Sequence, residues 1–216
     1  MTIEIELKYQ LSEDNKDHNT IVDDITAMLN IRGISFKTEK NKLVNDYFDN
    51  DNLALRKMDF GLRIRTKGLK YEQTIKTAGK IEAGLHQRPE YNVNIAERCL
   101  DLSLFPTNIW PENTNVMKLQ TSLQVLFSTN FSRHTWLIQL NESVIELALD
   151  SGDICTAPGK PSLVINEIEI ELVSGSEQAL FTLAEQLKDV VSMQPSNISK
   201  AARGYALYYD EIKKYK

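Results

Sequence analysis

The chain has 216 residues, of which 42% are hydrophobic and 25% charged, and its formal net charge is −5. This length suits one large domain or two small ones, and the acidic balance argues against a general nucleic-acid-binding protein, which usually carries a basic excess. The only cysteines, Cys99 and Cys155, lie far apart and offer neither a disulfide framework nor zinc-ligand spacing.

The first ten residues, MTIEIELKYQ, lack a basic region followed by an apolar run, so we expect no signal peptide. No apolar stretch approaches the length that crosses a bilayer. We therefore expect a cytoplasmic protein.

Residues 3 to 9, IEIELKY, alternate strictly between apolar and charged side chains, which is typical of a strand with one buried face. The charged face holds Glu4, Glu6 and Lys8. On pattern alone, such a face is more often solvent-exposed than part of a site.

Three amphipathic helices are predicted further along the chain: one from about 17 to 31, one from about 176 to 190 with Ser176 as a cap, and one beginning near Ser199. Gly33 is a suitable stop for the first of them. Between about 100 and 126, Pro106 and Pro111 favour short helices and loops.

The rest of the chain consists of short alternating segments, which read KLVNDYFD, GLRIRTK, YEQTIKTAG, RPEYNVNI, FSRHTWLIQL, SVIELALD and VINEIEIEL. They give about eight or nine strands with few helices between them. A doubly wound parallel sheet interleaves a helix with each strand, so an antiparallel α+β fold or a barrel fits better.

The charged faces of these strands differ in sign. Glu167, Glu169 and Glu171 share one face of their strand, whereas Arg63 and Arg65 share one face of another. Three glutamates in a row repel one another unless a cation is present, and paired guanidinium groups suit forked contacts with phosphate. If the polar faces turn toward one another, they form a lumen with a metal-binding wall and a phosphate-binding wall; periodicity leaves open whether they do.

The motifs then resemble a known family. EIELK at 4 to 8 is similar to the ExExK signature of the CYTH, or triphosphate tunnel metalloenzyme, superfamily. Further matches follow in order over nearly the whole chain: YFD, GLRIR, TIK, GLHQRPEYNV, LFSTNFSRHTWLI, IELALDSG, EIEIEL and SKAARGY. GLHQRPEYNV and SKAARGY resemble the bacterial inorganic triphosphatase branch in particular.

The resemblance implies an α+β fold in which eight antiparallel strands close into a barrel, the triphosphate tunnel, with helices packed on the outside. It implies that residues 1–216 form a single CYTH domain. Members of this branch often carry a CHAD domain after the CYTH domain, and we expect none in this chain.

The resemblance also implies roles for site residues. The implied metal ligands, for Mg²⁺ or Mn²⁺ and for two ions, are Glu4, Glu6, Asp150, Glu167, Glu169 and Glu171. The implied substrate-binding residues are Lys8, Arg63, Arg65, Lys76, Arg88, Arg133 and Lys200. The implied catalytic residues are Glu4, Glu6, Lys8, Arg63, Arg65 and Lys76. These residue types suit the chemistry, because Mg²⁺ prefers carboxylate oxygens and phosphoryl transfer depends on positioning and electrostatics.

Some assignments stay open at this point. The sequence does not decide which two of Glu167, Glu169 and Glu171 contact the metal. Glu72 and Glu90 are either lumen partners of cations or members of structural ion pairs. His86 lies either near a tunnel mouth or in a structural position, and Lys67 and Lys70 are expected to be solvated.

The predicted function is metal-dependent hydrolysis of inorganic triphosphate to pyrophosphate and phosphate. Alternatives are a class IV adenylyl cyclase, a thiamine triphosphatase, or a non-catalytic polyphosphate-binding module, which ranks low because both acidic strands keep their carboxylates. The expected partner is a small-molecule triphosphate, with no nucleic acid and no membrane, and formation of a homodimer is left open.

Overall fold

We analysed a computed structural model, which describes residues 1–12, 17–82 and 84–213. Its sheet has the strand order β10-β1-β9-β8-β7-β2-β3-β4-β6-β5, and all pairings are antiparallel. The strands are β1 (Thr2–Leu11), β2 (Ser35–Asp49), β3 (Gly61–Lys67), β4 (Lys70–Lys76), β5 (Lys80–Glu82), β6 (Leu85–Ile95), β7 (Gln124–Leu140), β8 (Ser143–Cys155), β9 (Ser162–Ser174) and β10 (Met193–Pro195).

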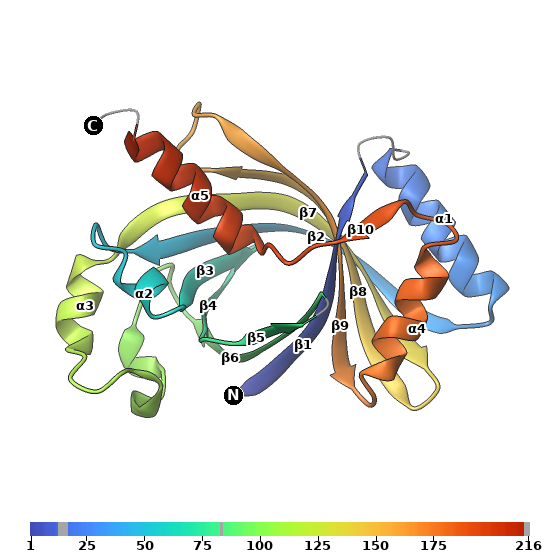
Figure 1. Ribbon diagram of the computed structural model, residues 1–216, viewed down its shortest axis with the longest axis horizontal. Helices are drawn as coiled ribbons and strands as arrows, with labels where there is room; N and C mark the ends of the chain where they lie inside the picture. Colours follow the sequence, from blue (N-terminus) through green and yellow to red (C-terminus); the bar gives the residue numbers. More distant parts are fainter. Residues whose placement is uncertain (13–16, 83, 214–216) are drawn as a thin grey trace.

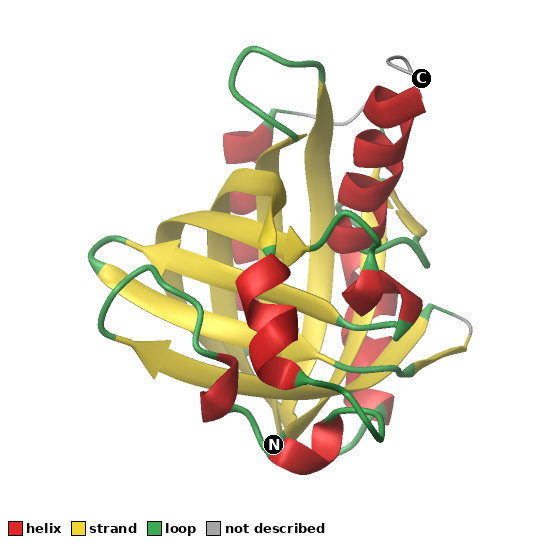
Figure 2. Ribbon diagram, turned by 90° about the vertical axis from the view of Figure 1, so that its left-hand side faces the viewer, coloured by secondary structure: helices red, strands yellow, loops and turns green. Residues whose placement is uncertain are grey.

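The sheet closes because β1 pairs with β9 along one edge and with β6 along the other. Eight strands therefore form a closed barrel, and β5 and β10 are short additions beside β6 and β1. Figure 2 shows the curved strands wrapping around a common interior. The predicted fold, a closed eight-stranded antiparallel barrel with helices outside, is confirmed.

Helices cover the barrel from outside (Figure 1). The helices are α1 (His18–Ile31), α2 (Ala54–Lys57), α3 (Val116–Ser122), α4 (Gln178–Leu187) and α5 (Lys200–Lys213), with short 3₁₀ helices η1 (Leu102–Leu104) and η2 (Thr107–Ile109). In the described part of the chain, no helix has both the length and the apolar content needed to cross a membrane.

The apolar stripes of α1 and α4 pack side by side on the outer faces of β1, β7, β8 and β9 (Figure 1). Ile25 and Leu29 of α1 and Leu183 of α4 are completely buried there, together with Trp136 of β7. Burying apolar side chains outside the barrel leaves the other face of each strand, with its charges, to line the interior.

The helix ends differ slightly from expectation. Asp17 caps α1, where its carboxylate accepts hydrogen bonds from the backbone N–H groups of Asn19 and Thr20. The helix expected from about 176 begins instead at Gln178, with Ser176 bonding to the Gln178 N–H. The Ser176 N–H is already bonded to the Ser143 hydroxyl, which holds that residue outside the helix.

The helix α5 packs across one end of the barrel, on β7, β8 and β9 (Figure 1). Tyr205 is buried against the edge of the Phe127 ring, and its hydroxyl donates a hydrogen bond to Asp49. Gly204 is in such close contact with Phe127 that a Cβ atom would collide with the ring. This close packing fixes the first turn of α5, which carries Lys200, at the barrel interior.

Candidate functional site

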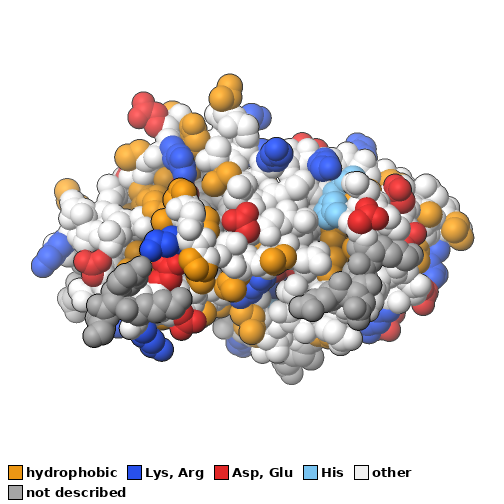
Figure 3. Space-filling view, turned by 90° about the horizontal axis from the view of Figure 1, so that it is seen from above, with side chains coloured by type: hydrophobic (Ala, Val, Ile, Leu, Met, Phe, Trp, Pro, Cys, Tyr) orange, Lys and Arg blue, Asp and Glu red, His pale blue; other side chains and the backbone are white. Residues whose placement is uncertain are grey.

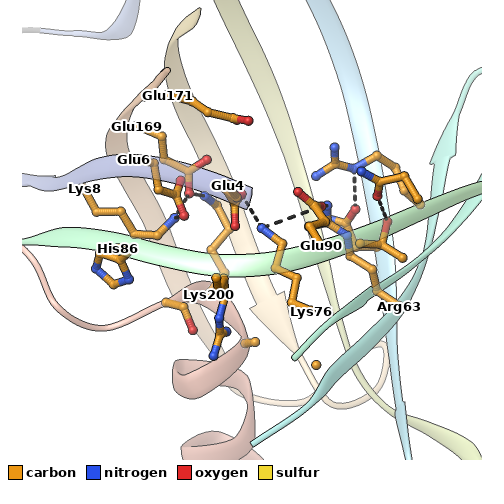
Figure 4. A pocket seen from close by; sticks show the side chains of 18 of the residues that line it. Glu4, Glu6, Lys8, Arg63, Lys76, His86, Glu90, Glu169, Glu171 and Lys200 are labelled. Carbon is orange, nitrogen blue, oxygen red and sulfur yellow. Dashed lines mark hydrogen bonds and ion pairs between the residues drawn. The ribbon is translucent and has the colours of Figure 1, made fainter. Parts of the chain in front are cut away.

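The interior of the barrel contains a cavity of about 310 Å³. Most of the predicted site residues line it: Glu4, Glu6, Lys8, Arg63, Arg65, Lys76, Arg88, Arg133, Glu169, Glu171 and Lys200. Figure 4 shows Glu6, Glu169 and Glu171 grouped at one side of this pocket and Arg63 at the other. Asp150 and Glu167 do not line the cavity, but both contact Lys200, which does.

The strand register explains this gathering. Glu6 of β1 is paired with Glu171 of β9, and Lys8 with Glu169, so two acidic strands lie next to each other. On the other edge of β1, Glu4 is paired with Arg88 of β6. In contrast, on one outer face of the molecule acidic and basic side chains are interspersed (Figure 3).

Asp150, Glu167 and Glu169 form a first carboxylate group, with ligand atoms within 4.8 Å of one another. Lys200 contacts all three: its Nζ lies 2.7 Å from Asp150 Oδ2 and 3.0 Å from Glu169 Oε1, and it also bonds to Glu167. Arg133 forms a forked pair with Asp150 at 2.7 Å and bonds Glu169 at 2.5 Å.

The positive charges of Arg133, Lys200 and Lys8 therefore balance the negative charges of these carboxylates. Burial alone would raise the pKa of Asp150 and Glu169, but Arg133, Lys200 and, for Glu169, Lys8 outweigh it and lower both pKa values. We refer to Asp150, Glu167 and Glu169 as the compensated group.

Arg203 belongs to this group of contacts and was not predicted from the sequence. Its Nη1 lies 3.0 Å from Glu167 Oε2. The available signal was its spacing, because a residue three positions after Lys200 lies on the same helix face.

Glu4, Glu6 and Glu171 form a second group in which the charges are not balanced. Among the described residues, Glu171 makes no ion pair, and burial together with Glu4 and Glu6 raises its pKa to about 8. One oxygen of Glu4 bonds to Lys76, but the other, Oε2, is buried and has no hydrogen-bond partner in the part of the chain that the structure describes.

Glu6 is paired with Lys8 at 2.8 Å, yet burial and the nearby Glu169 and Glu4 carboxylates raise its pKa. Lys8 itself is shared with Glu169 at 2.6 Å. Lys76 and Lys8 outweigh burial and lower the pKa of Glu4, whereas the pKa values of Glu6 and Glu171 are raised, so the neighbouring lysines only partly compensate these three carboxylates. We refer to these three residues as the uncompensated group.

Arg63 and Arg65 of β3 form the basic side of the cavity. Arg65 is held by a 2.9 Å hydrogen bond from its Nε to Asn45 Oδ1 and makes no ion pair with any described residue. Burial and the neighbouring Arg63 and Arg133 lower the pKa of Arg65 to about 10. Arg63 lies 3.6 Å from Glu90, and its buried Nε has no hydrogen-bond partner among the described residues.

Glu90 also lies 3.8 Å from Lys76, so its carboxylate lies between two basic side chains of the cavity. Arg88 reaches Asp59 at 3.5 Å, at the edge of the cavity. His86 lines the cavity as well, and its Nε2 lies 3.3 Å from the Ser196 carbonyl oxygen, a contact that fits the structural role; a position near a tunnel mouth stays a prediction. Lys67 and Lys70 are exposed, as expected.

Comparison with known proteins identifies the family to which this fold belongs. The model of the CYTH domain family matches residues 2–205. The inorganic triphosphatase of Haemophilus influenzae is 39% identical over an alignment of 170 residues, which covers 76% of this chain and 46% of that protein. The chain therefore spans about half the length of this curated relative.

Two solved structures share the fold at low identity. The HpAC1 protein from Hippeastrum, described as a candidate adenylyl cyclase with a dominant triphosphatase activity, has a TM-score of 0.59 and 19% identity over 96% of both chains. The PH1819 protein from Pyrococcus horikoshii OT3 has a TM-score of 0.55 and 17% identity over 99% of both chains.

Proposed function

This chain belongs to the CYTH domain family, and from that premise we propose that its tunnel hydrolyses inorganic triphosphate to pyrophosphate and phosphate with the help of a divalent cation. The supporting observation is the pair of opposite charges left unbalanced in one cavity. Within the described part of the chain, Arg65 and the Arg63 Nε lack bonded anionic partners on one side, and Glu171 and Glu4 Oε2 lack bonded cationic partners on the other. A triphosphate bound together with a divalent cation supplies both missing charges.

The relatives support the same activity. The matched Haemophilus protein is named an inorganic triphosphatase, and the match covers most of this chain. The Hippeastrum structure, although distant in sequence, is described with a dominant triphosphatase activity.

The uncompensated group fits Mg²⁺ or Mn²⁺, because hard divalent cations prefer carboxylate oxygens and Glu4 Oε2 has no other partner. Glu4, Glu6 and Glu171 would hold the ion, and Glu169, which borders both groups, could complete its ligands. When bound, a divalent ion neutralises phosphate charge and makes water a better nucleophile. The compensated group is less suited to this role, since Lys200, Arg133 and Arg203 already satisfy it.

The basic residues then bind and orient the substrate. Arg63, Arg65 and Arg133 present guanidinium groups whose N–H donors match phosphate oxygens, and their charge is permanent. Because these residues are fixed by Asn45, Glu90 and Asp150, the site is organised before the substrate arrives.

The chemical step balances as a simple hydrolysis. A water oxygen forms a bond to the terminal phosphorus, the bond from that phosphorus to its bridging oxygen breaks, and pyrophosphate leaves. One proton of the water stays on the phosphate product and the other passes to solvent. The negative charge that develops on the leaving group faces Arg65, Lys76 and Lys8, which stabilise it.

The test is phosphate release by the purified chain with Mg²⁺ or Mn²⁺, using tripolyphosphate, ATP and thiamine triphosphate in parallel, with a cyclic-AMP readout. We expect tripolyphosphate to be the best substrate and no cyclic AMP to form. Glu6→Gln should lower kcat by about 100-fold or more, as loss of a group that acts in the transition state does, whereas the exposed Glu185→Gln is the matched control. Cyclic AMP as the main product from ATP would overturn the proposal.

A further inference from the structure

A second cavity of about 270 Å³ continues the tunnel beyond the first. Its outer part is lined by Glu39, Lys67, Lys70 and Tyr71, none of which lines the first cavity. Four residues line both cavities: Arg65, Glu72, Arg133 and Glu146. We call these four residues the collar, because a substrate that extends from one cavity into the other must pass them.

The collar has a definite arrangement around the barrel. Glu146, Arg133, Arg65 and Glu72 lie on β8, β7, β3 and β4, and the strand order is β8-β7-β2-β3-β4. The two arginines are therefore flanked on both sides by a carboxylate. In a closed barrel of eight strands, β8 and β4 are four strands apart in either direction, so Glu146 and Glu72 belong to opposite walls.

Neither carboxylate is needed to fix the arginine beside it. Arg133 is held by Asp150 and Glu169 at 2.5 to 2.7 Å, while Glu146 lies 3.9 Å away with its side chain 37% exposed. Glu72 is paired with Arg65 in the strand register, but the Glu72 side chain makes no ion pair or hydrogen bond within the described part of the chain. Arg65 is held by Asn45 instead.

Carboxylates in this position oppose a polyanion. A phosphate held by Arg65 and Arg133 fills the collar, and the next phosphate of a longer chain would have to lie between Glu72 and Glu146. Like charges brought together in a partly desolvated passage repel strongly, and repulsion of the wrong ligand is a common source of specificity.

The lysines beyond the collar offer little compensation. Lys67 is paired with Glu39 at 3.1 Å, and both side chains are largely exposed. Lys70 is exposed as well. Charges in such positions are screened by solvent and salt, so they contribute less than the collar residues.

We propose that Glu72 and Glu146 are specificity-determining residues that limit the substrate to three phosphates by repelling the next phosphate of a longer linear polyphosphate. This inference rests on the proposed function and adds a chain-length limit to it.

The experiment compares kcat/KM for linear tetrapolyphosphate with kcat/KM for tripolyphosphate, in wild type, Glu72→Gln, Glu146→Gln and the double variant. Wild type should prefer tripolyphosphate, and the double variant should raise the tetrapolyphosphate-to-tripolyphosphate ratio by about tenfold or more, a fraction of what one close charge pair can supply. Glu39→Gln, which makes the same charge change at the outer rim, is the matched control and should change the ratio less than about twofold.

The outcomes separate the two proposals. If wild type releases no phosphate from tripolyphosphate, the proposed function fails. If wild type uses tripolyphosphate but the ratio stays constant in the double variant, or wild type uses both substrates equally well, the collar proposal fails alone. Circular dichroism and thermal melting of each variant verify that the ratios are measured on folded protein.

Discussion

Lys200 provides a sharp test of how the interior charges are held. Its side chain is 8% exposed, and its ammonium group contacts Asp150, Glu167 and Glu169. Burial disfavours its charge, but the three carboxylates outweigh this effect and raise the pKa of Lys200. Lys200→Met keeps a side chain of similar length and removes the positive charge.

The expected loss of stability follows from the burial of this cluster. Removing one partner of a buried ion pair costs about 3–5 kcal/mol, because the remaining charge is left uncompensated. Arg133 and Arg203 still contact the same carboxylates, so we expect the lower end, about 3 kcal/mol. For a chain of this size, 1 kcal/mol shifts Tm by about 2–4 °C, so Tm should fall by about 6–12 °C.

The assay is thermal unfolding of the metal-free protein. Lys188→Met is the matched control, since Lys188 is an exposed lysine paired with Glu185 and should contribute less than about 0.5 kcal/mol. Once the ammonium group is gone, a divalent cation can take its place, so Mn²⁺ should raise the Tm of Lys200→Met more than that of wild type. A Lys200→Met protein that melts like the control would refute the reasoning.

Three further outcomes are expected. Arg65→Lys should lower kcat/KM for tripolyphosphate by about 100-fold, because one ammonium group cannot replace the fork of N–H donors held by Asn45; steady-state kinetics with a melting curve would check this, and a near-normal rate would contradict it. The pKa of Glu171 is about 8 against a usual 4.5, so this carboxyl group contributes stability below pH 4.5 that is lost as pH rises through 8. Glu171→Gln should therefore flatten the decrease in the Tm of the metal-free protein between pH 4.5 and 8. An unchanged slope of Tm against pH would count against this prediction. Gly204→Ala should destabilise the protein by about 1–3 kcal/mol, measured by denaturant unfolding, because its Cβ atom meets the Phe127 ring; unaltered stability would show that α5 shifts freely.

The sequence was sufficient to predict the fold and most of the charged side chains that line the cavity, although Asp150 and Glu167 lie outside its lining. The alternation of apolar and charged residues assigned the charged side chains to one face of each strand. The apolar stripes of α1 and α4 indicated that the opposite faces are buried under helices, and Leu183 and Trp136 are indeed packed together there. Closing the barrel then requires the charged faces to meet, so the side chains at positions 6, 65 and 169 reach one cavity. The family resemblance supplied the closure that periodicity left open.

The partners of each charge could not be predicted in this way. Lys8 bonds to Glu169, 161 residues away, and Lys200 bonds to Glu167 across 33 residues. These contacts depend on strand register and on the packing of α5, where Tyr205 and Gly204 are fitted against Phe127. Side-chain periodicity carries neither kind of information. The single-domain organisation of residues 1–216 also stays a prediction.

The pairing pattern nevertheless divides carboxylates that look equivalent in the sequence. Glu167 and Glu171 share one face of β9, but Glu167 has Lys200 and Arg203 as partners. Among the charged groups of the described residues, those that affect Glu171 are other carboxylates and the more distant Lys76. A buried carboxylate without a partner is costly, so a fold keeps one where a ligand supplies the missing charge. Glu167 thus helps to fix the start of α5, while under the proposed function Glu171 would bind the divalent cation. The three glutamates of one strand would thus serve two purposes, and Glu169 lies between them, since it shares Lys8 with Glu6 and Lys200 with Glu167.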